Sequence, residues 1–176
     1  MATQLIADGS VRVHTILPNS AAPSRYTYAL DLPSGSAMKA LEGGAIAVVD
    51  SSNKLIAGVA APWARDADGN HVATRYEIAG TSFVQVVDPT TKTRYPVVAD
   101  PWMGTDLYSR VYLSWHPQGW RVNATPSAWG VLMNGVGTYW AHKDEVRTRV
   151  GSAYYTRTID SQHECHLLGW AFAFPE

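Results

Sequence analysis

The chain has 176 residues, of which 46% are hydrophobic and 16% charged, and its formal net charge is -1. This composition is typical of a globular protein with a buried core, in one domain or two small ones. The sequence has no basic stripe of the kind that nucleic-acid-binding proteins carry, and no apolar run reaches the roughly 18 residues of a membrane-spanning helix. We therefore predict neither nucleic-acid binding nor a transmembrane segment.

The first half reads as a series of antiparallel strands. Residues 11–17 and 25–32 alternate in character along the chain, a period of two that is typical of half-buried strands. Residues 45–60 contain two apolar runs around a Ser-Ser-Asn-Lys turn, and residues 75–88 contain two more runs that turn near Gly80. Both patterns predict β-hairpins.

A change of composition marks the start of the second half. Pro101 and Gly104 interrupt the strand pattern, and aromatic residues become more frequent after them. We expect two regions with a soft boundary: a hairpin-rich region over residues 1–99 and an α+β domain over residues 100–176. The two regions are also compatible with packing as one unit.

The second half is expected to form a sheet covered by a helix. Residues 107–130 contain two strand-like runs around a His-Pro-Gln-Gly turn. Residues 139–150 follow Thr138, a plausible N-cap, precede Gly151 and place apolar residues on one face, which predicts the main helix. The apolar run at the C-terminus predicts a central strand. The predicted fold class is therefore β-rich α+β, with antiparallel hairpins and sheet and one main helix near residues 139–150.

The chain's single cysteine, Cys165, stands in the sequence His-Glu-Cys-His. A nucleophilic thiol needs a nearby base, and in a strand His163 shares the face of Cys165 whereas His166 points the other way. The aromatic run that follows favours a buried cysteine instead. We keep Cys165, His163 and His166 as candidate catalytic residues of an alternative hypothesis.

Metal and cofactor sites are not predicted. One thiol and scattered histidines do not match the ligand spacing of zinc sites. Asp66, Asp68 and Asn70 alternate as in a calcium loop, but Gly69 stands at the fourth position of the loop instead of the sixth, and no helix flanks it. An Asp-Gly-Asn hairpin turn is the simpler interpretation.

Aromatic residues are the most prominent candidates for binding. The chain has 7 tryptophans and 9 tyrosines, most of them in the second half. Trp115 and Trp120 flank the predicted turn, and Tyr154, Tyr155 and Arg157 follow the predicted helix, so these five are our candidate binding residues. Core packing is the alternative for each aromatic ring.

The second half also resembles a known family. The ordered set VVADPWMGTDLYSRV, GWRVNATPSAWG and QHECH followed by aromatics, over Val97 to Phe174, resembles a secreted actinobacterial domain of unknown function, number 2599. The first half is similar to a segment that often precedes YPVVADP in exported actinobacterial proteins. The resemblance implies an exported protein whose signal peptide was removed, and it implies no catalytic residues. The N-terminus itself, which lacks a signal-peptide pattern, fits either a cytosolic chain or a removed signal.

Three functional hypotheses follow. The leading one is a secreted, non-enzymatic interaction protein that binds a protein partner or a cell-envelope component, such as a glycan, through an aromatic-rich surface. The alternative is a secreted enzyme or antibacterial toxin that uses Cys165 with a histidine in acyl transfer or hydrolysis. A third is a precursor whose first half shields the second.

Overall fold

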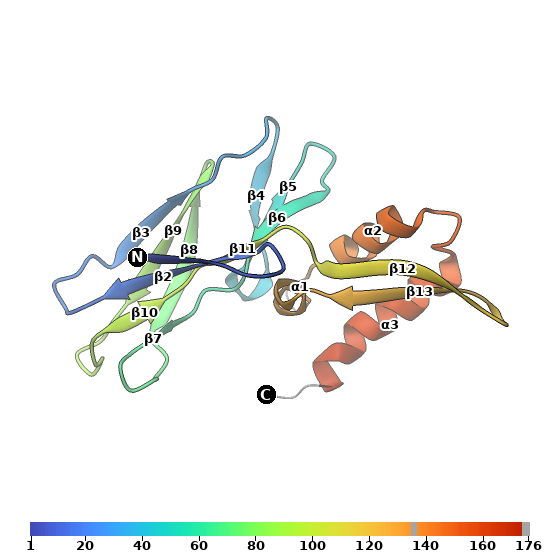
Figure 1. Cartoon of the computed structure of the whole chain (residues 1–176). Helices are drawn as coiled ribbons and strands as arrows, with labels where there is room; N and C mark the ends of the chain where they lie inside the picture. Colours follow the sequence, from blue (N-terminus) through green and yellow to red (C-terminus); the bar gives the residue numbers. More distant parts are fainter. Residues whose placement is uncertain (135–136, 174–176) are drawn as a thin grey trace. The chain divides into compact units, whose positions relative to one another are not determined.

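The computed structural model describes the backbone of residues 1–134 and 137–173 and the side chains of residues 1–134 and 137–169. The chain divides into two compact units, Met1–Thr105 and Asp106–Glu176, which we call the N-terminal and the C-terminal unit (Figure 1). The boundary expected near Asp100 falls a few residues before this division. Antiparallel sheets dominate and helices are fewer, which confirms the predicted β-rich α+β class.

The N-terminal unit consists almost entirely of strands (Figure 1). In chain order they are β1 (Ala2–Leu5), β2 (Val11–Leu17), β3 (Arg25–Ala29), β4 (Ala37–Ala40), β5 (Ile46–Val49), β6 (Leu55–Val59), β7 (Ala64–Arg65), β8 (Ala73–Ala79), β9 (Ser82–Asp88), β10 (Val97–Ala99) and β11 (Trp102–Gly104), with a short 3-10 turn at Glu42–Gly44. The larger sheet has the order β4-β5-β6-β11-β2-β10-β7, with β1 paired to β2, and the smaller has the order β3-β9-β8.

Both hairpins predicted in this unit are confirmed. Strands β5 and β6 pair antiparallel across a turn in which the amide of Asp50 donates to the carbonyl of Lys54. Strands β8 and β9 pair down to Ala79 and Ser82, on either side of the turn at Gly80. Gly80 has a φ of 61°, a left-handed conformation that glycine adopts without strain.

The core of the N-terminal unit lies between the two sheets. Val13, Ile46 and Val59 of the larger sheet pack against Tyr28 and Phe83 of the smaller one, and all five side chains are buried. The rings of Tyr28 and Phe83 stack with their centroids 5.1 Å apart. The period-two apolar pattern of the sequence therefore corresponds to the inward faces of a two-sheet packing.

A buried carboxylate lies between the sheets as well. Asp100 Oδ1 accepts hydrogen bonds from the backbone N–H of Trp63 at 3.0 Å and from Gln85 Nε2 at 3.2 Å. Asp100 has no exposed surface, and burial raises its pKa from 3.8 to about 6. Removal from water disfavours the charged form more than these hydrogen bonds favour it.

The C-terminal unit is a β-hairpin packed against helices (Figure 1). Its elements are β12 (Tyr108–His116), β13 (Gly119–Pro126), α1 (Ala128–Met133), α2 (Tyr139–Val150) and α3 (Arg157–Ala173). The predicted helix over residues 139–150 is confirmed, with Thr138 in the N-cap position and Gly151 at its C-terminal end. None of the described helices is both long and apolar enough to cross a membrane.

The expectation of a C-terminal strand is wrong, because the segment forms helix α3. The hydroxyl of Thr156 accepts the backbone N–H of Ile159 at 3.4 Å, which satisfies one of the free donors at the helix start. Ile159, His163 and Leu167 then follow at a spacing of four and line one face. A short apolar run does not distinguish a strand from a helix, and here the residues before the run decide.

Candidate functional site

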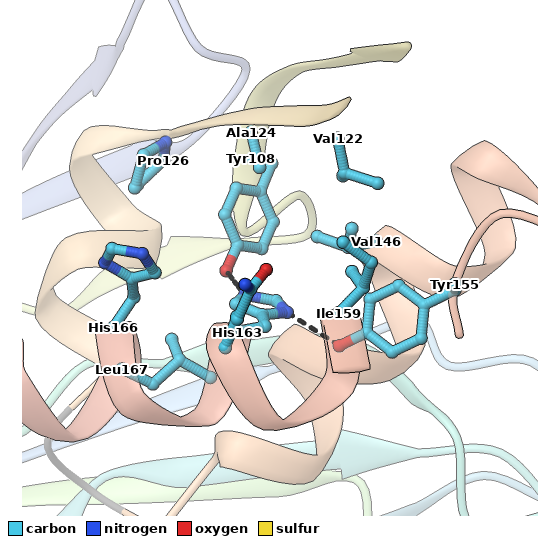
Figure 2. Close-up of a pocket in the computed structure, with 11 residues that line it drawn as sticks. Tyr108, Val122, Ala124, Pro126, Val146, Tyr155, Ile159, His163, His166 and Leu167 are labelled. Atoms are coloured by element: carbon cyan, nitrogen blue, oxygen red, sulfur yellow. Dashed lines mark hydrogen bonds between the residues drawn. The ribbon is translucent and has the colours of Figure 1, made fainter. Parts of the chain in front are cut away.

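A pocket of about 330 Å³ opens in the C-terminal unit between the hairpin and the helices (Figure 2). Its apolar wall comes from β13, from α2 and from α3: Val122, Ala124, Pro126, Val146, Ile159 and Leu167. Its polar groups are Tyr108, Tyr155, Gln162, His163 and His166. An apolar cavity with a few convergent polar groups is the usual form of a small-ligand site.

A bulge in the hairpin places Tyr108 in this pocket. The strands pair in register from Arg110 onward, but Tyr108 pairs with Pro126, so Ser109 is the extra residue of β12. An extra residue reverses which face the preceding side chain occupies. Tyr108 therefore lies on the face that carries Ala124, towards the helices.

Four side chains from distant parts of the unit form a chain of hydrogen bonds at the pocket. His142 Nδ1 lies 3.2 Å from the hydroxyl of Tyr108, and that hydroxyl lies 2.6 Å from His163 Nε2. His163 Nδ1 lies 2.8 Å from the hydroxyl of Tyr155. Both nitrogens of the His163 ring are thus engaged by tyrosines, as Figure 2 shows. We call these four residues the His–Tyr chain.

Burial keeps the His–Tyr chain uncharged at neutral pH. Together with a smaller contribution from neighbouring imidazoles, it lowers the pKa of His142 and of His163 from 6.5 to about 4 for each. Burial also raises the pKa of Tyr155 to about 12 and that of Tyr108 above its usual range. Each imidazole therefore has one protonated and one unprotonated nitrogen, and each phenol has its proton.

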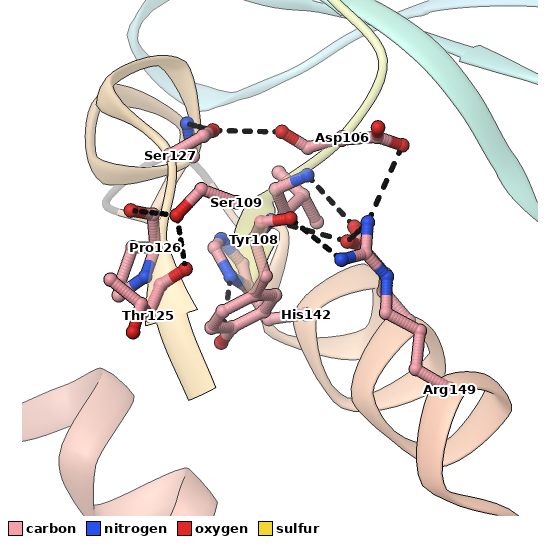
Figure 3. A network of polar contacts seen from close by, with 11 residues as sticks. Asp106, Tyr108, Ser109, Thr125, Pro126, Ser127, His142 and Arg149 are labelled. Carbon is pink, nitrogen blue, oxygen red and sulfur yellow. Dashed lines mark hydrogen bonds and ion pairs between the residues drawn. The ribbon is translucent and has the colours of Figure 1, made fainter. Parts of the chain in front are cut away.

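A polar network fixes the backbone of Tyr108 from the other side (Figure 3). The carboxylate of Glu145 accepts the backbone N–H groups of Leu107 and Tyr108 at 2.8 and 3.1 Å. Arg149 donates to the carbonyl of Tyr108 at 2.8 Å and pairs with Glu145 at 2.7 Å. Helix α2 thus holds the first residue of β12 in place.

The charged residues near the pocket compensate one another. Lys143 of α2 lies 2.9 Å from the carboxylates of both Asp160 and Glu164 of α3, and Arg147 lies 3.3 Å from Asp160. None of these four residues lines the pocket. Two cations facing two carboxylates leave no excess charge beside the cavity.

The structure separates the predicted Cys–His pair. On α3, His163 and His166 are three residues apart and both line the pocket, but Cys165 does not, and its side chain is exposed. Positions two apart on a helix point in nearly opposite directions. Within the described residues no hydrogen bond joins the thiol to either imidazole, so the strand-based pairing of Cys165 with His163 and the expectation of a buried thiol are both wrong.

A chain of exposed rings forms a second candidate site at the end of the hairpin. Trp115 and Trp120 are cross-strand partners whose rings meet edge to face at 5.3 Å, and the ring of Tyr154 meets Trp120 in the same way at 5.5 Å. Trp115 is 68% exposed, Trp120 51% and Tyr154 38%. We call these three residues the aromatic ridge.

The other two predicted binding residues have different positions. Tyr155 is buried and belongs to the His–Tyr chain, while Arg157 is exposed at the first position of α3. Sequence reasoning missed Tyr108 and His142, which are 34 positions apart in the chain. No local signal connects them, because the bulge and the packing of α2 bring them together.

The acidic loop at Asp66 is a turn in the structure. Asp66 Oδ1 accepts the backbone N–H groups of Asp68 and Asn70 at 3.0 and 2.9 Å. The carboxylate therefore satisfies the turn's own donors, as the hairpin interpretation predicts. Across residues 1–134 and 137–173 the structure shows no group of three or more histidine, cysteine, aspartate or glutamate residues arranged to hold a metal ion.

Comparison of the chain with family models, with curated proteins and with solved structures gives no match. The resemblance to the secreted actinobacterial domain accordingly stays a prediction, and the function is inferred from the geometry of the C-terminal unit.

Proposed function

We propose that this chain is a secreted, non-enzymatic interaction protein whose aromatic ridge binds a protein of the cell envelope. The observation that supports the proposal is the exposure of two indoles, Trp115 and Trp120, side by side at the end of a hairpin. Large apolar rings that gather on a surface mark sites of interaction. Export is inferred from the sequence resemblance.

The composition around the ridge favours a protein partner. Tryptophan, tyrosine and arginine are the residues most enriched where protein interfaces have their binding energy. The ridge combines two tryptophans with Tyr154, and arginines stand close by in the chain at Arg121 and Arg157.

The side chains of the aromatic ridge are also preorganised by contacts within the unit. Trp115 and Trp120 are partners on paired strands. The ring of Tyr154, in the segment between α2 and α3, packs edge to face against Trp120. Side chains that are already ordered lose less conformational entropy on binding. We therefore expect these rings to dominate the affinity.

The test compares the full chain with a double variant, Trp115→Ala and Trp120→Ala. Binding is measured against two fractions of the envelope of the organism that encodes the chain: detergent-extracted proteins, and the glycan that remains after protease treatment. We expect binding to the protein fraction, and a loss of at least about tenfold in affinity in the double variant, the effect of one strong hot spot.

Tyr112→Ala is the matched control. Tyr112 is a 41% exposed ring of the same hairpin, but it pairs with Asn123 and so lies on the opposite face from Trp115. Its removal should leave binding unchanged, and thermal unfolding should show that the double variant keeps its fold. Full binding by the double variant, collapse of its fold or binding to the glycan fraction alone contradicts the proposal.

A further inference from the structure

The hydrogen bonds of the His–Tyr chain permit two arrangements of protons. In the first, His142 Nδ1–H donates to Tyr108, Tyr108 donates to His163 Nε2, and His163 Nδ1–H donates to Tyr155. In the second, donor and acceptor exchange roles in each of these three hydrogen bonds. A neutral imidazole has one donor and one acceptor, so the bonds reverse together.

The ring of His142, at one end of the His–Tyr chain, decides which of the two proton arrangements is favoured. The second one puts the proton of His142 on Nε2, which is buried and has no hydrogen-bond partner among the described residues. A buried N–H group without an acceptor is rare in proteins, and an unpaired acceptor is less so. The first arrangement leaves Nε2 as an unprotonated nitrogen and avoids the orphaned donor.

The favoured proton arrangement determines which hydrogen bond Tyr155, at the opposite end of the His–Tyr chain, can make. In the first arrangement the oxygen of Tyr155 accepts from His163, so its own O–H remains free to donate. Tyr155 lines the pocket, where the remaining wall is mostly apolar. The pocket thus presents one free hydroxyl donor in a mostly apolar wall, whose other polar groups include Gln162 and His166.

We propose that this pocket binds an uncharged, largely apolar molecule of one or two rings whose carbonyl oxygen accepts a hydrogen bond from Tyr155. The site is distinct from the aromatic ridge and adds a small-molecule function to the proposed one. Its volume of about 330 Å³ lies at the small end for ligand sites, which limits the ligand to a compact molecule.

Charge complementarity excludes ionic ligands. Among the described residues that line the pocket there is no arginine, lysine, aspartate or glutamate. The charges of Lys143, Arg147, Asp160 and Glu164 on the two helices are engaged with one another. A carboxylate or an ammonium group would lose hydration in this pocket without gaining an oppositely charged arginine, lysine, aspartate or glutamate partner.

The proton arrangement is measured first. Imidazole nitrogen chemical shifts of the isotope-labelled full chain at neutral pH report which nitrogen of His142 and of His163 is protonated. We expect the Nδ1–H tautomer for both residues, whereas the reversed arrangement requires Nε2–H for both. An Nε2–H tautomer on either residue overturns the proposal.

Ligand choice is measured with four probes that share a naphthalene ring and are similar in size: acetylnaphthalene, ethylnaphthalene, naphthol and naphthoate. Binding is followed by shifts of the Leu167 and Val146 methyl signals. We expect acetylnaphthalene to bind about fivefold more tightly than ethylnaphthalene, the effect of one hydrogen bond, and naphthoate to bind most weakly. Tyr155→Phe should abolish the preference for the ketone.

Tyr154→Phe is the matched control, because it deletes the hydroxyl of the adjacent exposed tyrosine and should leave the preference unchanged. Thermal unfolding shows whether Tyr155→Phe keeps its fold, and in the wild-type chain the ketone preference is tested without any substitution. Equal binding of ketone and hydrocarbon, tighter binding of naphthol than of ketone, or failure of all four probes to bind overturns the proposal.

Discussion

Replacing Gly130 with alanine should destabilise the C-terminal unit, although alanine is the better helix former. Gly130 is buried in α1, and a Cβ atom added there would lie 1.9 Å from the carbonyl oxygen of Leu107 and 2.7 Å from its carbonyl carbon. These are backbone atoms, so a side-chain rotation does not relieve the clash. The segment around Leu107 or helix α1 has to move.

The expected cost follows from what that movement breaks. The carbonyl of Leu107 accepts a hydrogen bond from the backbone N–H of Ser127 at 2.9 Å, and the backbone N–H of Leu107 donates to Glu145 at 2.8 Å. Overpacking costs about 1–3 kcal/mol, and each weakened hydrogen bond adds about 1 kcal/mol. Against this, alanine gains about 1 kcal/mol in helix propensity. We expect a net loss of about 2–4 kcal/mol in the free energy of unfolding of the C-terminal unit.

Gly169→Ala in α3 is the control, because a Cβ atom there meets no atom of the described residues within 4 Å. Helix propensity then acts alone, and stability should rise by up to about 1 kcal/mol. Urea unfolding of both variants, followed through amide NMR signals of the C-terminal unit, measures the two changes. A Gly130→Ala variant as stable as the wild type would refute the packing of α1 against Leu107.

The remaining predictions concern pH and the thiol. His142 and His163 have folded pKa values of about 4, below the unfolded 6.5, so the C-terminal unit should lose stability as pH falls from 6.5 towards 4, by about 3 kcal/mol per residue at most. Unfolding curves across this range that do not change with pH would disprove the neutral His–Tyr chain. Asp100 has a folded pKa of about 6, above its ordinary value of 3.8, so the N-terminal unit should gain stability as pH falls from 6 towards 4. Asp100→Asn should remove this dependence in the same unfolding assay. Cys165 is exposed and should react fully with a thiol reagent in the native chain, as intact mass shows, whereas labelling that requires denaturant would contradict its position on α3.

Local patterns in the sequence correctly predicted most of the elements. Alternating side chains and turn residues predicted the β5–β6, β8–β9 and β12–β13 hairpins, and cap residues predicted helix α2. These elements are determined within a few neighbouring residues. The apolar end of α3 indicates a strand and so gives a wrong prediction, whereas Thr156 and the spacing from Ile159 to Leu167 are the helical signal.

Of the two candidate sites, one could be predicted from local sequence and the other could not. The sequence predicted that Trp115 and Trp120, whose rings meet edge to face in the structure, flank a tight turn. It did not determine the His–Tyr chain, whose members lie on β12, α2, α3 and the segment before α3. These four residues meet through tertiary contacts, because a one-residue bulge turns Tyr108 towards the helices and because the packing of α2 and α3 brings His142 and His163 to the same hydroxyl.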